Sequence, residues 1–131
     1  MKANEFRINN LVYYNGNNNE IGVITSIQTT VLKQCYIYLN NRINNVLDLD
    51  LIKQIPLTEE WLIKLGFEED KNQSFYFYKH NYYDIYIRIF KGGAISFLMV
   101  NDYIELKSVH QLQNLYFALT NKELKYEKKD L

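Results

Sequence analysis

Short runs of apolar and aromatic residues, separated by turn-forming clusters, constrain the fold of this chain more than any other feature. In EIGVITSIQ (20–28), apolar residues alternate with small or polar ones at the two-residue period of a β-strand. Three more short runs lie nearby: LVYY (11–14), CYIYLNN (35–41) and NVLDLDL (45–51). An Asn-rich cluster follows the first of these and another follows the second. Residues 1–55 are therefore predicted to form a small, curled, SH3-like sheet, a β-barrel-like subdomain.

A second group of strand-like segments fills residues 74–107, which we predict to be a four-stranded antiparallel meander. The segments are SFYFYK (74–79), YYDIYIRIFK (82–91), AISFLMV (94–100) and YIELK (103–107). Gly92-Gly93 is typical of a two-residue hairpin loop, which would pair Ile87 with Leu98. A turn at Asn101-Asp102 would pair Met99 with Ile104 in the same way.

This pairing would divide the side chains of the meander between two faces. One face would hold Tyr86, Arg88, Phe90, Ile95, Phe97, Met99, Ile104 and Leu106. The other would hold Ile85, Ile87, Ile89, Leu98 and Val100. Neither face is polar enough to lie bare in water, so both should be covered. A slip of one residue would exchange the sets.

A short helix is predicted within IPLTEEWLIKLGF (55–67). Thr58 is a suitable N-cap, and Glu59 and Glu60 lie in the first turn, where the helix dipole favours negative charge. Gly66 suits the left-handed position after the last turn. This helix would link the N-terminal sheet to the meander.

A second helix is predicted at residues 109–120, where Ser108 and Gln111 have the spacing of a capping box. Its apolar stripe would be Val109, Leu112, Leu115, Tyr116 and Leu119. The opposite side would carry His110, Gln113, Asn114 and Phe117. We therefore expect His110 to be exposed or half-buried. The predicted fold class is α+β, with an α-β-β-β-β-α subdomain at 56–131 that is separate from residues 1–55 or joined with them in one unit.

Charge and cysteine content restrict the function classes. The chain has 15 Lys and Arg against 15 Asp and Glu, so no basic half marks a duplex-binding protein. The single cysteine, Cys35, excludes an intrachain disulfide framework and fits a reducing compartment. No apolar run approaches the roughly 18 residues of a membrane span. We predict a cytoplasmic protein without a membrane partner.

Candidate chemistry is sparse. His80 and His110 have no metal ligand at a suitable spacing, and Cys35 stands alone within a strand pattern. The acidic groups at 48–50 and 68–70 lack the loop of a calcium site and suggest a solvated strand end and an acidic turn. We predict no metal, no cofactor, no catalytic residue and no enzyme activity.

Tyrosine supplies the best indication of function, since twelve occur in the chain. A tyrosine-rimmed sheet is typical of a protein interface, and we predict a protein partner or a homodimer. The predicted partner-binding residues are Tyr76, Tyr78, Tyr83 and Tyr103. An alternative is single-stranded nucleic-acid binding through Tyr86 and Arg88, where an aromatic ring and a cation alternate along a strand. A further alternative is a sponge or hydrolase for a nucleotide-like ligand.

Three stretches carry a family resemblance: NEFRINNLVYYNG (4–16), IPLTEEWLIKLGFE (55–68) and VHQLQNLYFALTNKEL (109–124). They resemble a family of short, uncharacterised bacterial proteins that often accompany phages and prophages. That family usually has glycine where Asn9 or Asn10 stands, and it has no known activity to carry over. The resemblance implies a small accessory protein made inside a bacterial cell, acting on host or defence components. SVHQLQNLYFALT is predicted to be part of the scaffold and not a catalytic motif.

Overall fold

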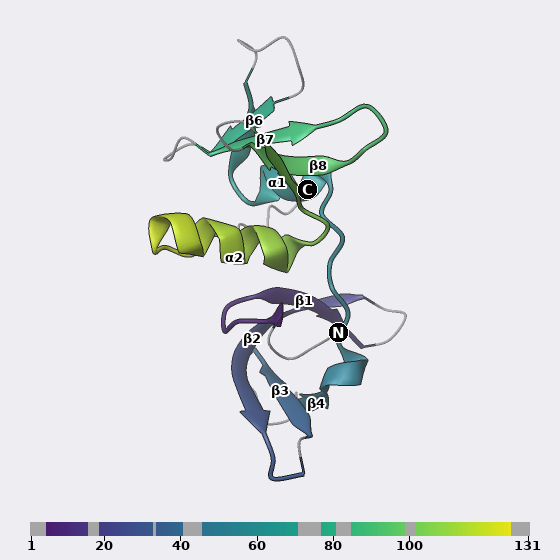
Figure 1. The fold of residues 1–131 in the computed structure, drawn as a ribbon. Helices are drawn as coiled ribbons and strands as arrows, with labels where there is room; N and C mark the ends of the chain where they lie inside the picture. The colour runs from purple at the N-terminus through teal and green to yellow at the C-terminus, as the bar shows by residue number, and fades with distance from the viewer. Residues whose placement is uncertain are drawn as a thin grey trace.

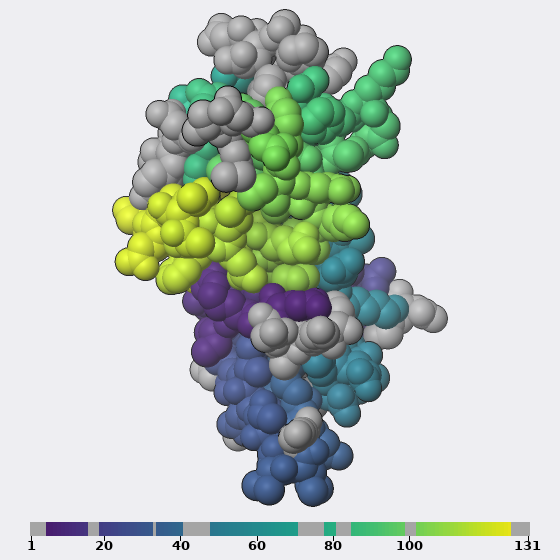
Figure 2. Space-filling model, in the orientation of Figure 1, coloured from purple at the N-terminus to yellow at the C-terminus, as the bar shows by residue number. Residues whose placement is uncertain are grey.

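The computed structural model describes residues 5–15, 19–32, 34–40, 46–70, 77–80, 85–98 and 102–126. The fold is α+β, as predicted, with two antiparallel sheets. Figure 1 shows the C-terminal helix lying between the two sheets, and the space-filling view in Figure 2 shows the same three layers in contact. Each layer is therefore packed on the next along the long axis of the molecule.

The N-terminal sheet has the strand order β1-β2-β3-β4. Its strands are β1 (Leu11–Tyr14), β2 (Glu20–Thr29), β3 (Cys35–Leu39) and β4 (Val46–Asp48). The predicted strand at 45–51 is wrong in its second half, because a 3-10 turn, η4 (Leu49–Leu51), replaces it. The Asp48 side chain accepts a hydrogen bond from the Asp50 N–H, and such a local bond competes with strand pairing.

After η4 the chain returns to the first strand. Tyr13 and Lys53 exchange two backbone N–H···O hydrogen bonds, each of 2.9 Å. Inside this sheet lies a small core cluster, formed by Phe6, Val12, Ile24, Ile37, Leu39 and Ile52. Leu11, the neighbour of Val12, belongs to the other core cluster. Strand β1 is therefore buried on both faces.

The C-terminal sheet has five strands, so the prediction of four is wrong by one. The strands, in spatial order, are β5 (Phe67–Glu69), β6 (Phe77–His80), β7 (Tyr86–Ile89), β8 (Ile95–Leu98) and β9 (Tyr103–Glu105). The missed strand is β5, where Phe67 pairs with His80. Its exposed Glu68 and Glu69 resemble an acidic turn in the sequence, but charged side chains are also common on edge strands.

The predicted pairing of β7 with β8 is wrong by one residue. Ile87 lies opposite Phe97, because the loop contains Lys91 as well as Gly92 and Gly93. Phe90 N–H donates to the Ala94 carbonyl at 2.8 Å, and the two glycines have φ values of 108° and 95°. The slip exchanges the predicted sets, so that Ile85, Ile87 and Ile89 share a face with Ile95 and Phe97.

The pairing of β8 with β9 is also displaced, by two residues. Leu98 lies opposite Tyr103, and Phe97 lies opposite Ile104. A shift of two residues keeps every side chain on its face, because the period of a strand is two. Tyr103 therefore lies on the same side of the sheet as Leu98.

The two predicted helices are confirmed. In α1 (Glu59–Lys64), the Thr58 hydroxyl accepts from the Trp61 N–H at 3.3 Å, and Gly66 follows with φ of 91°. In α2 (Val109–Thr120), Ser108 and Gln111 form the capping box. Local side-chain contacts therefore determine where each of the two helices begins.

The larger core cluster joins α1, α2, one face of the C-terminal sheet and β1. Its buried members are Leu11, Ile55, Leu57, Trp61, Leu62, Leu65, Phe67, Tyr78, Ile85, Ile87, Ile95, Leu106, Val109, Leu112, Tyr116 and Leu124. The face of the C-terminal sheet turned toward this cluster is called the inner face below, and the opposite face is called the outer face.

Candidate functional site

The outer face of the C-terminal sheet carries the predicted nucleic-acid residues and one predicted partner-binding residue. The pairing of the five strands places a mixed set of side chains there: Glu68, Lys79, Tyr86, Arg88, Phe90, Ser96, Leu98, Tyr103 and Glu105. None of these side chains belongs to either core cluster of the described residues. The outer face is therefore the candidate partner surface.

Arg88 organises the centre of this face. Its guanidinium carbon lies 4.4 Å from the centroid of the Phe90 ring and 5.6 Å from that of the Tyr103 ring. Its Nη1 donates a hydrogen bond to the Tyr103 hydroxyl at 3.1 Å. The two rings meet edge to face, with centroids 5.1 Å apart. The three side chains, called the Arg88 cluster below, hold one another in place.

Charges of both signs surround the Arg88 cluster. Lys79 Nζ lies 5.7 Å from the centroid of the Tyr86 ring, and Glu68 is directly opposite Lys79 in the pairing of β5 with β6. Glu105 is opposite Ser96, which is itself opposite Arg88. Among the described residues, the face thus presents aromatic rings beside two cations and two carboxylates.

The predicted site residues separate into three groups. Tyr86, Arg88 and Tyr103 share the outer face, and all three are half-buried. Tyr76 and Tyr83 lie outside the described residues. Phe90 was placed on the same face as Arg88 by its two-residue spacing, but it was not predicted to be a site residue.

Tyr78, which was predicted to bind a partner, does not lie on the outer face. Tyr78 pairs with Ile87 on the inner face and is only 3% exposed. Its hydroxyl donates a hydrogen bond to the Glu59 carboxylate in the first turn of α1. Burial, assisted by the hydrogen bond and negative charge of Glu59, raises the pKa of Tyr78 well above its usual range. Tyr78 therefore joins α1 to the sheet.

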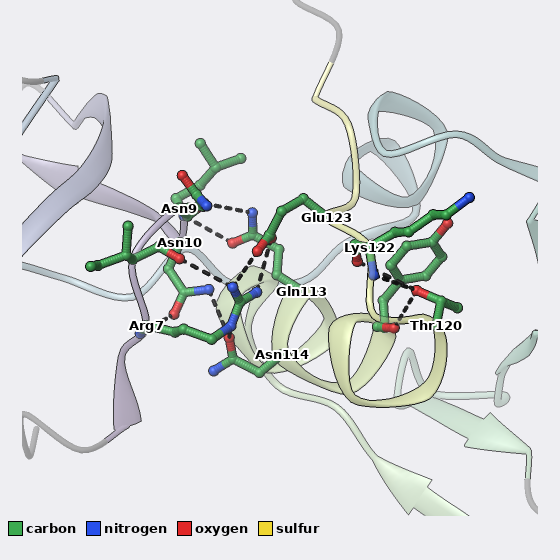
Figure 3. Close-up of polar contacts among 11 residues, drawn as sticks. Arg7, Asn9, Asn10, Gln113, Asn114, Thr120, Lys122 and Glu123 are labelled. Carbon is green, nitrogen blue, oxygen red and sulfur yellow. Dashed lines mark hydrogen bonds and ion pairs between the residues drawn. The ribbon is translucent and has the colours of Figure 1, made fainter.

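A second polar constellation joins α2 to the N-terminal sheet (Figure 3). Gln113 is 2% exposed; its Oε1 accepts from the Leu11 N–H at 2.8 Å, and its Nε2 donates to the Asn9 carbonyl at 3.2 Å. Asn114 Oδ1 accepts from Asn10 Nδ2 at 2.8 Å and from Arg7 Nε at 3.2 Å. Gln113 therefore satisfies backbone groups of Asn9 and Leu11, while the Asn9 N–H and the Asn10 carbonyl pair with Ile24 of β2.

An ion pair closes this constellation. Arg7 donates through both terminal nitrogens to the two oxygens of Glu123, with Nη2···Oε2 at 2.9 Å. The guanidinium also lies 4.2 Å from the centroid of the Phe117 ring. The hydrogen bond from Arg7 lowers the pKa of Glu123, against the opposing effect of burial. The polar residues of this constellation are called the junction: Arg7, Asn9, Asn10, Gln113, Asn114 and Glu123.

His110 contradicts the expectation of an exposed or half-buried side chain. It is 2% exposed, with its ring 4.6 Å from that of Phe6, and its Nδ1 has no hydrogen-bond partner among the described residues. Burial lowers its pKa, with a smaller opposing effect from Glu5. Helix α2 is buried on two sides because it lies between the sheets, so the side opposite the apolar stripe is covered as well. The polar groups of QLQN (111–114) are used within the chain.

The described residues contain no group of three or more His, Cys, Asp or Glu side chains placed to hold a metal ion. Within the same ranges, no helix has the length and apolar character needed to cross a membrane. Comparison with models of protein families, with curated proteins and with solved structures found no match to this chain.

Proposed function

We propose that this chain is a non-enzymatic binding protein that holds a protein partner against the outer face of the C-terminal sheet. The Arg88 cluster is the observation that carries the proposal. Arg, Tyr and other aromatic residues supply much of the binding energy at protein interfaces. Because Arg88, Phe90 and Tyr103 already contact one another, less side-chain freedom is lost when a partner binds.

The charges of the outer face favour a protein over a nucleic acid. Lys79 and Arg88 lie among Glu68 and Glu105, so the part of the face that the structure describes has no excess of positive charge. A phosphate backbone would be repelled by the two carboxylates, whereas a protein surface can supply both signs. The partner is a second copy of the chain or a different protein.

The context of the proposal comes from the sequence resemblance. A phage- or prophage-encoded accessory protein would work in the bacterial cytoplasm, where a binding surface can act on host components. The N-terminal sheet would be SH3-like; the 3-10 turn η4 and the return of Lys53 to Tyr13 support that interpretation. In this arrangement α2 and the N-terminal sheet pack on the inner side of the C-terminal sheet, and its outer face is left for the partner.

The test combines self-association with capture. Light scattering after size exclusion, over a range of concentrations, shows whether the chain forms a dimer. Tagged wild type, Tyr86→Ala/Tyr103→Ala and Ile63→Ala are then compared for proteins retained from a bacterial lysate. Ile63 is 49% exposed on α1 and is the matched control. A dimer or a retained protein that only the double variant loses supports the proposal; a monomer with identical retention by all three contradicts it.

Single-stranded nucleic-acid binding is the second candidate, because cations lie against aromatic rings on the outer face. Retention on a single-stranded oligonucleotide would weaken with salt and with Tyr86→Ala or Arg88→Ala. Absence of retention at low salt would exclude it.

A further inference from the structure

The C-terminal sheet ends in two edge strands of different character, β5 and β9. In β5 the exposed side chains are Glu68 and Glu69, and charges of one sign discourage pairing with a further strand. In β9 the sequence is Tyr-Ile-Glu, and Ile104 at its centre is 43% exposed. An apolar side chain at the centre of an edge strand is a surface that a further strand can cover.

The hydrogen bonds between β8 and β9 show which backbone groups of β9 face outward. Leu106, which directly follows β9, donates its N–H to the Ile95 carbonyl of β8 at 2.8 Å. Residues two apart along a strand direct their backbone groups to the same side. The backbone groups of Ile104 therefore point toward β8, as those of Leu106 do, whereas the N–H and C=O groups of Tyr103 and Glu105 point away from the sheet.

The contacts on this outward side agree with the assignment and end before Glu105. The Lys107 carbonyl accepts from the Leu57 N–H at 3.0 Å, because the segment before α1 runs beside residues 107–109. The chain then enters α1 and leaves the edge. At the other end of β9, the Tyr103 N–H donates to Asp102 Oδ1 at 2.7 Å. Among the described residues, none pairs with the outward backbone groups of Glu105.

An antiparallel copy of β9 would complete the hydrogen bonds of this edge. If Ile104 lies opposite Ile104 of a second copy, Tyr103 lies opposite Glu105 in both halves of the pair. The Glu105 N–H would then donate to the Tyr103 carbonyl of the second copy, and the Tyr103 N–H of that copy would donate to the Glu105 carbonyl. The Tyr103 N–H would exchange the Asp102 carboxylate for this carbonyl.

The side chains are complementary in the same register. The two Ile104 side chains would form a non-hydrogen-bonded pair, in which side chains come closest, and would cover each other from water. On the outer face, Glu105 would lie beside the Tyr103 ring of the second copy. That hydroxyl accepts from Arg88 at 3.1 Å and can still donate its own proton to a carboxylate. The same pairing of β5 would place Glu68 opposite Glu68, which like charges oppose.

We infer that two copies of the chain associate through β9, edge to edge about a two-fold axis at Ile104, so that their C-terminal sheets form one continuous sheet. The contact uses the same strand of both copies, so it closes at a dimer. The dimer is weak and forms at high protein concentration, because each copy contributes a strand of 3 residues. This inference uses the edge of the sheet and not the outer face, so it does not depend on the proposed function.

Sedimentation equilibrium of the full chain, over a range of concentrations, tests the dimer. Wild type is expected to dimerise as the concentration rises. Ile104→Lys and Ile104→Glu each place like charges at the axis, so each variant alone should lose the dimer. An equimolar mixture of the two variants should restore it, because opposite charges then face each other. Ile63→Lys, at a 49% exposed site on α1, is the matched control and should dimerise like wild type.

Amide hydrogen exchange, followed by NMR, gives a second readout on the wild type alone. The Glu105 N–H points away from the sheet, so it should exchange fast in dilute protein and more slowly as the dimer forms. The Ile104 N–H points toward β8 in either state, so its exchange should change little and provides the internal reference.

The inference is overturned if wild type stays monomeric at every concentration, if Ile104→Lys dimerises as wild type does, or if the mixed variants do not associate. Circular dichroism shows whether each variant is folded, and hydrogen exchange of the wild type decides where one is not. A Glu105 amide that stays unprotected in the dimer would also overturn it. A dimer that Tyr86→Ala abolishes and Ile104→Lys leaves intact would place the second copy on the outer face, which supports the proposed function instead.

Discussion

Gln113 Oε1 accepts a hydrogen bond from the Leu11 N–H across 102 residues of sequence. The side-chain amide of Gln113 lies in the middle of α2 and provides the acceptor for the N–H of the first residue of β1. A buried N–H without a partner is costly, so this contact is one of those that hold the helix against the N-terminal sheet.

Replacement of Gln113 by Met should destabilise the protein. Met keeps the length of the side chain but leaves the Leu11 N–H and the Asn9 carbonyl without their partner, at a cost of about 1–3 kcal/mol. Urea unfolding followed by circular dichroism measures the change. Leu119→Ser on the exposed side of the same helix should stay within about 0.5 kcal/mol of wild type. Equal stability of the two variants would contradict the role of Gln113.

The ion pair between Arg7 and Glu123 should show coupling in a double-mutant cycle. Its side chains are 28% and 31% exposed, and both carboxylate oxygens are used, so we expect a coupling energy of about 1 kcal/mol. Arg7→Met, Glu123→Gln and the double variant are compared by urea unfolding. High salt should reduce the coupling. Additive effects would mean that the pair contributes nothing beyond its separate parts.

Acid should destabilise the protein through its histidines. Burial lowers the pKa of His80 and of His110 in the folded state, so the unfolded chain takes up protons first as the pH falls below 6.5. The free energy of unfolding is therefore greatest above this pH and falls below it. Each histidine that stays neutral contributes a slope of up to about 1.4 kcal/mol per pH unit.

His110→Phe tests the part of this effect that His110 contributes. Phe keeps an aromatic ring beside Phe6 and removes the titrating group, so the slope between pH 5 and 6.5 should become shallower. Unfolding curves in urea at several pH values give the slope for each protein. An unchanged slope would show that His110 does not carry the pH dependence.

Gly66→Ala should lower the melting temperature. The position has φ of 91°, and an added Cβ would lie 3.4 Å from His80 Nε2, so we expect a loss of about 1–3 kcal/mol. Gly66→Asn should cost less, because Asn tolerates positive φ better than Ala does; Asn121 ends α2 with φ of 58°. Differential scanning calorimetry measures the melting temperature of each variant. A higher melting temperature for Gly66→Ala than for Gly66→Asn would contradict this ranking.

Features that depend on neighbours in the sequence could be predicted. Thr58 and the Ser108–Gln111 pair fix the starts of both helices through contacts within four residues. The strands β1 and β2 follow directly from alternation and turn residues. No long-range partner is needed for any of these assignments.

Features that depend on distant partners could not be predicted. One additional loop residue, Lys91, moves Tyr86 and Arg88 to the face opposite Ile95. No local signal in the sequence distinguishes the predicted two-residue loop from the observed three-residue loop. Tyr78 pairs with Ile87, and this pairing in the same sheet places its side chain on the buried inner face. His110 is covered by Phe6, which lies 104 residues earlier in the sequence. The polar residues around His110 on the helix therefore did not indicate that its side chain is buried.

The position of α2 between the sheets has a consequence for synthesis on the ribosome. Leu11 belongs to a cluster that also requires Val109, Leu112 and Leu124. The N-terminal strands emerge first, yet one of their faces stays open to water until residues near the C-terminal end have been translated. Folding is therefore completed late, and nascent chains must keep this apolar face from associating with other chains before α2 arrives.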